Sequence, residues 1–566
     1  MAAASPGPDS VAELEALFSL AQHEHRAGRL AEAAEAYGKI LAIRPDIAEI
    51  HNNLGVVLRT LGQLDQAVAR YRQAIALKPD LADAHNNLGN VLREQGQLEQ
   101  AAARYRQAIV LRPDYAEAHN NLGTVLLIQG KLDEAAARLT QALDLRPDYA
   151  EAHNNLGNVL LTQDKLELAA RRYRQALALR PNYTEAHSNF GNALLSQGKL
   201  DEAAAQCEYA LALRPDYAEA HNSLGIVRWE QGKFKEAAAR FERALALRPD
   251  YAEPHWGLAA CYLVEGDYER GWPAYEGRLR TPGLEPRHSL PRWAGEPLAG
   301  RSLLLFAEQG LGDAIQFIRY ARPLKQRGAR VVLACQAALG RLLASNSDLD
   351  ELFIQDSSGA LPRCDYYLPL LSVPYVLRTN AATIPCEVPY LAADPKLTAE
   401  WHEQLAGIDG FKIGIAWQGS RDFRFDGWRS IPLAQFAPLA GLPGVRLVSL
   451  QKGFGSEQVA TVDFPVLDLS ARLDEAAGPF MDTAAVIRGL DLVVTSDTAV
   501  AHLAGALGVP VWVALQFSPN WRWLRDREDS PWYPTMRLFR QTTFGGWADV
   551  FQRIAEAVQA RRSETA

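Results

Sequence analysis

Residues 82–115, ADAHNNLGNVLREQGQLEQAAARYRQAIVLRPDY, hold the unit from which the first half of the chain is built. Residues 116–149, AEAHNNLGTVLLIQGKLDEAAARLTQALDLRPDY, repeat it closely, and the pattern returns every 34 residues over roughly residues 14–283. A proline ends the second helix of each copy, because proline cannot continue the hydrogen-bond ladder. A repeated pair of helices predicts an α-solenoid in which neighbouring repeats share one core.

Several columns of this repeat have a predictable structural role. Leu-Gly pairs such as Leu54-Gly55, and the column that contains Ala67, lie where two antiparallel helices approach each other most closely. One histidine recurs in every repeat, and because each is a full repeat from the next we interpret the column as packing and not as metal binding. These histidines are His51, His85, His119, His153, His187, His221 and His255.

The columns resemble the tetratricopeptide (TPR) family, although His replaces the Trp of its W-x-x-L-G-x-x-Y signature and Leu usually replaces the Tyr. In that family the residue two positions after each histidine lines a concave face, and here it is mostly asparagine, whose amide offers donors and an acceptor to a peptide backbone. The column also resembles the asparagine ladder of O-GlcNAc transferases, which implies a protein acceptor on this face; recent duplication of the repeat is the alternative explanation. The predicted acceptor-binding residues are Asn53, Asn87, Asn121, Asn155 and Asn189, and Ser223 continues the column.

After a proline-rich segment, residues 284–300, short apolar runs alternate with amphipathic helices, which predicts parallel sheets. The runs form two groups, so we predict two Rossmann-like halves, residues 301–395 and 396–562, the second ending in a C-terminal helix. Ligands are expected in the cleft at the carboxyl ends of the strands. The predicted strands are residues 302–307, 330–335, 412–417, 446–450, 492–496 and 509–515.

Two loops carry the predicted chemistry, and each follows a strand and opens a helix. In the first, Glu308–Asp313, the small residues Gly310 and Gly312 let an anion or a sugar approach free backbone N–H groups. In the second, Ser496–His502, backbone N–H groups and Thr498 are suited to a diphosphate.

The two loops together resemble those of heptosyltransferase-like GT-B glycosyltransferases over roughly residues 300–545. The ordered segments GDYERGW, EQGLGDAIQFIRY, RSIPL, DTAVAHLAGALGVPVW, WRWL, SPWYP and MRLFRQ resemble bacterial fusions of TPR repeats with a glycosyltransferase, some of them linked to flagellin glycosylation. The resemblance implies a nucleotide-sugar donor, used as a substrate and not as a cofactor, and no bound metal.

Matched position by position, the resemblance makes Asp313 the general base, although Asp313 also suits a helix cap. It makes Asp497, Thr498, Ala499, Val500 and His502 donor-binding residues. Arg429 and Lys452 are candidates to offset the charge of the leaving diphosphate, or are surface charges. The family often has a lysine near the first of these, where this chain has RFDGWRSIP, so the resemblance does not name the donor.

The composition narrows the classes of function. A net charge of -8 argues against binding of nucleic acid by phosphate neutralisation. The five cysteines are scattered and lack C-x-x-C spacing, so we expect neither a disulfide framework nor a zinc site. The sequence shows no signal-like start and no apolar run of membrane length, so we expect a cytoplasmic protein without a membrane span. We interpret Asp348-Leu349-Asp350 as a loop or cap and not as a metal-binding D-x-D, and Trp521, Trp523, Trp532 and Tyr533 as core rather than as a stacking platform.

The prediction is therefore an inverting, metal-independent glycosyltransferase that moves a sugar to a hydroxyl of a protein acceptor held by the TPR face, with flagellin as one candidate. Two alternatives stay open. The acceptor is a lipid-linked or polysaccharide sugar, or the second half only binds nucleotide sugars as part of a scaffold.

Overall fold

The computed structural model describes residues 8–281, 284, 289–355, 362–420 and 426–565. The chain divides between Pro215 and Asp216 into two compact units, which are described separately below. No helix of the described residues is long and apolar enough to cross a membrane.

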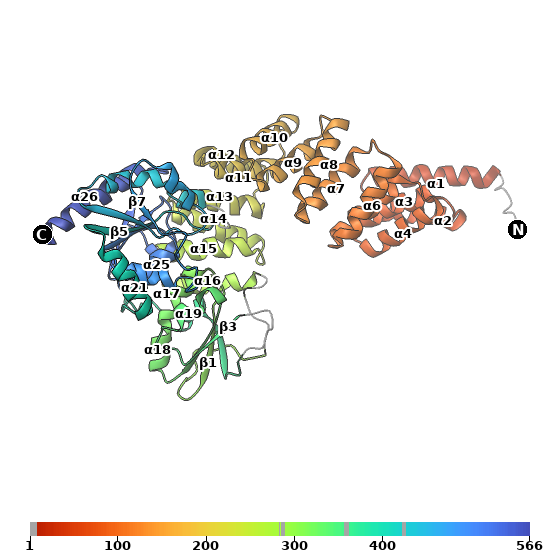
Figure 1. Ribbon diagram of the computed structural model, residues 1–566. Helices are drawn as coiled ribbons and strands as arrows, with labels where there is room; N and C mark the ends of the chain where they lie inside the picture. The colour runs from red at the N-terminus through yellow and green to blue at the C-terminus, as the bar shows by residue number, and fades with distance from the viewer. Residues whose placement is uncertain (1–7, 282–283, 285–288, 356–361, 421–425, 566) are drawn as a thin grey trace. The chain divides into compact units, whose positions relative to one another are not determined.

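Unit 1 is a helical solenoid in which each helix packs against its partner and against the next pair (Figure 1). The first helices of the pairs are α1 (Pro8–Arg26), α3 (Ala48–Thr60), α5 (Ala82–Glu94), α7 (Ala116–Ile128), α9 (Ala150–Thr162) and α11 (Thr184–Ser196). The second helices are α2 (Leu30–Ile43), α4 (Leu64–Leu77), α6 (Leu98–Leu111), α8 (Leu132–Leu145), α10 (Leu166–Leu179) and α12 (Leu200–Leu213).

The repeated glycine and histidine columns explain the close packing of this unit. A Cβ on Gly55 would lie 2.6 Å from the ring of Tyr71, so only glycine lets the second helix approach. In unit 1 each histidine of the column is buried, and its Nε2 donates to the carbonyl of the proline six residues earlier. This confirms the packing role, because the histidine satisfies a carbonyl at the end of the preceding helix. The pairs, each at 3.0 Å, are His51 with Pro45, His85 with Pro79, His119 with Pro113 and His153 with Pro147.

Unit 2 begins with two more helix pairs and continues into two parallel sheets (Figure 1). The pairs are α13 (Ala218–Glu230) with α14 (Phe234–Leu247) and α15 (Ala252–Val264) with α16 (Tyr268–Tyr275), which a short 3-10 turn, η1 (Glu276–Arg280), follows. The first sheet has the order β3-β2-β1-β4 and the second the order β10-β9-β8-β5-β6-β7. All strand pairs are parallel, as predicted.

The strands are β1 (Ser302–Phe306), β2 (Arg330–Cys335), β3 (Glu351–Ile354), β4 (Tyr366–Pro369), β5 (Phe411–Ala416), β6 (Val445–Ser449), β7 (Val466–Asp468), β8 (Leu492–Ser496), β9 (Val511–Leu515) and β10 (Met536–Arg540). The helices around them are α17 (Leu311–Phe317), α18 (Ala321–Gln326), α19 (Gly340–Leu343), α20 (Val373–Val376), α21 (Pro395–Ala406), α22 (Asp426–Arg429), α23 (Ala437–Ala440), α24 (Met481–Arg488), α25 (Ala499–Ala506) and α26 (Trp547–Thr565).

The sequence identified the central strands and missed β3, β4, β7 and β10. All four are sheet edges. Edge strands are short and carry charged or half-exposed residues, as in ELFI and MRLFR, so they lack the continuous apolar run that marks a buried parallel strand.

The division between the units differs from the boundary that the sequence suggests. The two compact units divide within the repeats, between Pro215 and Asp216, and not at the proline-rich segment 284–300, of which residues 285–288 lie outside the described part. The last helix pairs share a core with both sheets, and Trp272 donates its indole N–H to the carbonyl of Thr379 at 2.7 Å. Trp272 also meets Trp521 edge to face at 5.4 Å. Because these contacts are extensive, α13–α16 belong to the compact unit that contains the sheets.

Candidate functional site

A cavity of about 1040 Å³ opens within unit 2, between the two sheets and helices α13 and α15. In the first sheet the strand order reverses between β1 and β4, and in the second between β5 and β8. Loops that follow strands beside such a reversal diverge and leave a crevice for ligands. Every site residue predicted for the α/β domain lines this one cavity. They are Gly310, Gly312, Asp313, Arg429, Lys452, Asp497, Thr498, Ala499, Val500 and His502.

The first loop holds Asp313 in a fixed position at the start of α17. Gly310 is the N-cap, and its backbone N–H donates to Oδ2 of Asp313 at 3.0 Å. Asp313 therefore caps the helix from its third position rather than as the N-cap residue, and it supplies one half of a capping box, because Gly310 has no side chain to complete it. Its Oδ1 remains for another partner, and its side chain is 21% exposed.

That partner is Arg522, which comes from the second half and which the sequence analysis missed. Arg522 lies in the 3-10 turn η7 (Trp521–Trp523), is 6% exposed, and donates to Oδ1 of Asp313. It also donates to Gln316 Oε1 at 2.5 Å and to Asn520 Oδ1 at 2.9 Å. Burial lowers the pKa of Arg522 more than any other single cause, but Asp313, Tyr275 and Asp497 together outweigh it and the pKa is raised, so the cavity contains a fixed cation. An arginine between two tryptophans was the only signal in the sequence.

The second loop meets the first across the cavity. A Cβ on Gly312 would lie 3.0 Å from Cδ2 of His502 and 3.4 Å from Cα of Ala499, so glycine is needed for this approach. Thr498 is the N-cap of α25, and the backbone N–H groups of Ala499 and Val500 have no acceptor among the described residues. A helix start with free N–H groups that faces a cavity is suited to binding an anion.

His502 is held as a neutral imidazole. Its Nδ1 lies 3.0 Å from the hydroxyl of Tyr533, and its ring stacks on Trp523 with centroids 5.4 Å apart. Burial, and then the charges of Arg522 and Arg319, lower the pKa of His502 well below its usual value. His502 therefore supplies hydrogen bonds and no positive charge. Burial also acts on Asp497, where it favours the neutral carboxyl and so raises the pKa.

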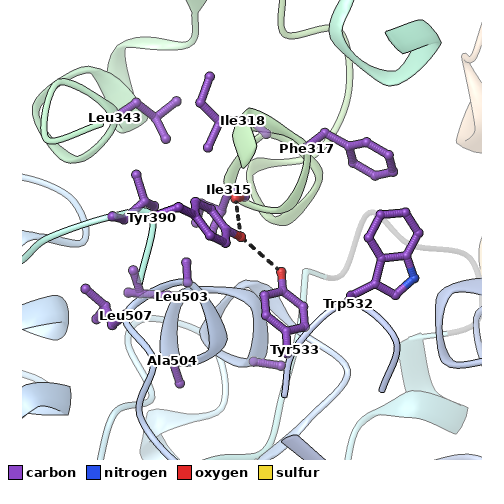
Figure 2. Packing of buried hydrophobic residues seen from close by; sticks show 14 of the residues in the cluster. Ile315, Phe317, Ile318, Leu343, Tyr390, Leu503, Ala504, Leu507, Trp532 and Tyr533 are labelled. Atoms are coloured by element: carbon purple, nitrogen blue, oxygen red, sulfur yellow. Dashed lines mark hydrogen bonds between the residues drawn. The ribbon is translucent and has the colours of Figure 1, made fainter. Parts of the chain in front are cut away.

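Beneath the cavity, α17 and α25 pack against each other around Tyr390. Figure 2 shows Tyr390 between Ile315 of α17 and Leu503 of α25, with Tyr533 beside it and Phe317 directed toward Trp532. The hydroxyl of Tyr390 donates to the carbonyl of Ile315 at 3.0 Å and lies 3.4 Å from that of Tyr533. This buried packing fixes the floor of the cavity. Of the aromatic cluster, Trp532 and Tyr533 are core residues as predicted, whereas Trp521 also lines the cavity.

The two predicted cations differ in how they are held. Arg429 donates to Asp426 at 2.6 Å, and a Cβ on Gly419 would overlap its guanidinium, so glycine makes room for Arg429 at the cavity wall. Lys452 is more exposed and pairs with Glu475 at 2.8 Å. Arg429 is therefore the better fixed of the two.

A second cavity, of about 470 Å³, lies on the second half and shares Gln418, Gln516 and Ser518 with the first. Aromatic side chains such as Trp428 and Phe544 line it. The side-chain Oε1 of Gln516 and Nε2 of Gln541 are buried and have no partner among the described residues. An apolar pocket with a few unpaired amide groups suits a flat polar ring.

The asparagines of unit 1 form a ladder between repeats. All five predicted asparagines are half-buried, and in four of them Nδ2 donates to Oδ1 of the asparagine that precedes the equivalent position one repeat earlier. Asn53 instead accepts from Nδ2 of Asn52 at 3.4 Å. The column thus has a structural role that the sequence analysis did not consider. Asn121 and Asn155 make further bonds: their Nδ2 also donates to Asn90 Oδ1 and Thr124 Oγ1, respectively, at 3.2 Å, and their Oδ1 accepts from Nδ2 of the preceding asparagine at 3.4 Å. The pairs are Asn87 with Asn52 at 3.0 Å, Asn121 with Asn86 at 3.0 Å, Asn155 with Asn120 at 2.9 Å and Asn189 with Asn154 at 3.0 Å.

The Asp348-Leu349-Asp350 segment lies away from the cavity. Asp348 pairs with Arg322 at 3.1 Å, and Asp350 pairs with Lys325 and accepts the backbone N–H of Val331 at 2.8 Å. These contacts agree with a loop stabilised by ion pairs. Within the described ranges, no group of three or more His, Cys, Asp or Glu side chains could hold a metal ion.

Comparison with known proteins identifies the repeats. A family model described as TPR repeat matches residues 57–93, 89–128, 123–164, 157–198 and 191–232. Two models described as tetratricopeptide repeat match residues 11–48 and 228–271. TPR repeats therefore extend across residues 11–271, including the first helix pairs of unit 2.

Among curated proteins, Protein FlbA of Caulobacter vibrioides is 29% identical over 331 residues, which are 53% of this chain and 54% of FlbA. The chain thus spans about half the length of this relative. Similar solved structures include the APC/C hetero-tetramer Cut9-Hcn1, at 17% identity over 43% of this chain and 48% of that one, with a TM-score of 0.40. YrrB, described as a TPR protein with an unusual peptide-binding site, is 27% identical over 32% of this chain and 95% of its own, with a TM-score of 0.27.

Proposed function

We propose that this chain is a glycosyltransferase that moves a sugar from a nucleotide-sugar donor to a hydroxyl of a protein acceptor, with inversion and without a metal ion. The observation that supports it best is the Asp313–Arg522 pair, which spans the cavity beside the free N–H groups of α25. A carboxylate, a buried cation and a helix N-terminus are the groups that transfer from a sugar diphosphate requires.

The donor diphosphate would bind at the start of α25. The N–H groups of Ala499 and Val500 and the guanidiniums of Arg429 and Arg522 would offset its charge as the nucleoside diphosphate leaves. Lys452 would add a weaker, more exposed contribution. The nucleoside would extend into the adjoining cavity, where Gln516 and Gln541 offer unpaired amide groups.

Asp313 would be the general base, and its pairing with Arg522 sets an order of events. A carboxylate held by an arginine is a poor proton acceptor, so Arg522 would first turn to the donor phosphates. The freed carboxylate would then take the proton of the acceptor hydroxyl. The oxygen of that hydroxyl bonds to the anomeric carbon on the face opposite the breaking bond to phosphate, and the leaving group departs with the electron pair of that bond.

The protein acceptor would be captured on the TPR face through the half-buried amides of the asparagine column, with flagellin as one candidate. None of the five cysteines forms a disulfide within the described part of the chain, which suits a reducing compartment, and we place the reaction in the cytoplasm.

The test measures nucleotide release from a panel of UDP-, GDP- and CMP-sugars in the presence of flagellin or of a glycan acceptor. We expect D313N to lower kcat on the order of 10²-fold or more with little change in donor affinity. D348N, which alters a carboxylate paired with Arg322 away from the cavity, is the matched control and should keep full turnover. Equal turnover of D313N and wild type would exclude Asp313 as the base. Turnover with the glycan alone would replace the protein acceptor by a glycan, and no turnover at all would favour a scaffold.

A further inference from the structure

The last residue of α13, Glu230, comes from a TPR repeat but lines the same cavity as Asp313 and Arg522. It is 4% exposed. The repeat does not require a carboxyl at this position, because the other repeats carry a varied set of residues there. They are Thr60, Glu94, Ile128, Thr162, Ser196 and Val264.

Glu230 has an unusual environment for a carboxyl group. Ser518, in the loop after β9, donates its hydroxyl to Oε2, and no cation pairs with Glu230 among the residues that the structure describes. Burial raises its pKa to about 8, against the opposing hydrogen bond from Ser518, so near neutral pH the group is mainly a neutral acid. A serine or amide could bond Ser518 at a smaller desolvation cost. A structural contact alone therefore does not account for a carboxyl here.

The surroundings of Glu230 are those of a binding wall. Trp229 and Trp256 line the cavity beside it, both half-buried. The turn after α13 packs on the same loop as Ser518, since a Cβ on Gly232 would lie 3.5 Å from the ring of Phe517. Apolar and aromatic walls with a single well-held polar group are typical of sites that orient a ligand.

We propose that Glu230 is a positioning residue for the acceptor polypeptide. Its carboxyl group hydrogen-bonds the peptide backbone next to the acceptor hydroxyl, and Trp229 and Trp256 line the path of the chain. This inference rests on the proposed function and extends it, because the last repeats then build the acceptor side of the cavity themselves. A neutral carboxyl can both donate and accept a hydrogen bond, which matches the two polar groups of a peptide unit.

The test measures KM for flagellin as acceptor, KM for the donor, and kcat. E230L removes the polar group at similar volume, and we expect about a tenfold rise in acceptor KM with donor KM and kcat within about twofold of wild type. E230Q keeps a donor and an acceptor in place and should restore acceptor KM. E94L changes the residue at the same position of a repeat in unit 1 and is the matched control.

Further variants separate this role from a structural one. If Glu230 only anchored the loop, S518A would raise acceptor KM as much as E230L; we expect a smaller rise, because the Glu230 carboxyl stays in the cavity wall without Ser518. Unchanged acceptor KM in E230L, or equal effects of S518A and E230L, would overturn the inference while the wild type still transfers sugar. If the wild type modifies no protein, the proposed function fails as well. Should E230L not fold, E230A takes its place.

Discussion

Arg278 and Glu308 form an ion pair in which both side chains are 0% exposed, and replacing Arg278 tests how the repeats hold the loop that carries Asp313. Arg278 lies in η1, directly after the last TPR helix, whereas Glu308 opens the loop that carries Asp313. Its Nη2 donates to Glu308 Oε1 and to Ser372 Oγ, both at 2.7 Å. R278M keeps the length of the side chain but leaves Glu308 as a buried carboxyl without its cation. Breaking one side of a buried pair costs about 3–5 kcal/mol.

The loss of unfolding free energy in R278M should depend on pH in a defined direction. Burial raises the pKa of Glu308, and Arg278 opposes that rise, so removing Arg278 raises the pKa of the folded state further. The folded state then binds more protons than the unfolded state above the ordinary glutamate pKa, and stability falls as pH rises, by at most about 1.4 kcal/mol per pH unit. R278M should therefore be least destabilised near pH 5 and most destabilised near pH 8. The double variant R278M/E308Q removes the buried charge and should recover most of the loss.

Tryptophan fluorescence during denaturant unfolding isolates this effect, because all 12 tryptophans lie between Trp229 and Trp547 and report on unit 2 alone. R301M is the matched control, since Arg301 pairs with Asp365 at the surface with 58% of its side chain exposed and should contribute about 1 kcal/mol or less. Equal losses of unfolding free energy in R278M and R301M would show that the buried ion pair contributes no more than a surface pair. A double variant as unstable as R278M would show that the unpaired carboxyl does not cause the loss.

Three further variants test the site. G312A places a Cβ 3.0 Å from His502, so we expect it to destabilise unit 2 by about 1–3 kcal/mol and to weaken donor binding. Titration with nucleotide sugars measures the donor affinity, and an unchanged affinity would contradict the close approach of the two loops. R522M should weaken donor binding about tenfold or more in the same titration, whereas R322M, which changes a surface arginine paired with Asp348, should not. Replacing Asn87, Asn121 and Asn155 by Ala should weaken acceptor binding and spare the donor. Replacing their partners Asn52, Asn86 and Asn120 removes the same inter-repeat bonds, so it should lower the stability of unit 1 without lowering the acceptor affinity. An equal loss of acceptor affinity in both triple variants would leave the ladder a purely structural role.

The sequence predicted what depends on local pattern. The 34-residue period identified the solenoid, and buried parallel strands such as β1 and β8 were evident as apolar runs. The glycines of the first loop were recognised because a strand precedes them and a helix follows. Each of these signals lies within a few residues of the chain.

What the sequence missed depends on contacts between distant segments. Arg522 reaches Asp313 across 209 residues, and nothing near either residue indicates the other. Arg278 directly follows the last repeat in the sequence, but its side chain donates a hydrogen bond to Glu308, at the start of the loop that carries Asp313. The proline-rich segment was interpreted as a linker, because the local composition does not reveal the aromatic contacts that Trp272 makes with the α/β core. The inter-repeat role of the asparagines likewise requires knowing which side chain faces the next repeat.

The intact mass of an acceptor protein tests the central proposal most directly. Flagellin would be incubated with each nucleotide sugar and with wild type, D313N or D348N, and then weighed by mass spectrometry. The account predicts that wild type and D348N add whole sugar residues from at least one donor and that D313N adds none in the same time. An unchanged flagellin mass with every donor, while a glycan acceptor gains sugar, would contradict it.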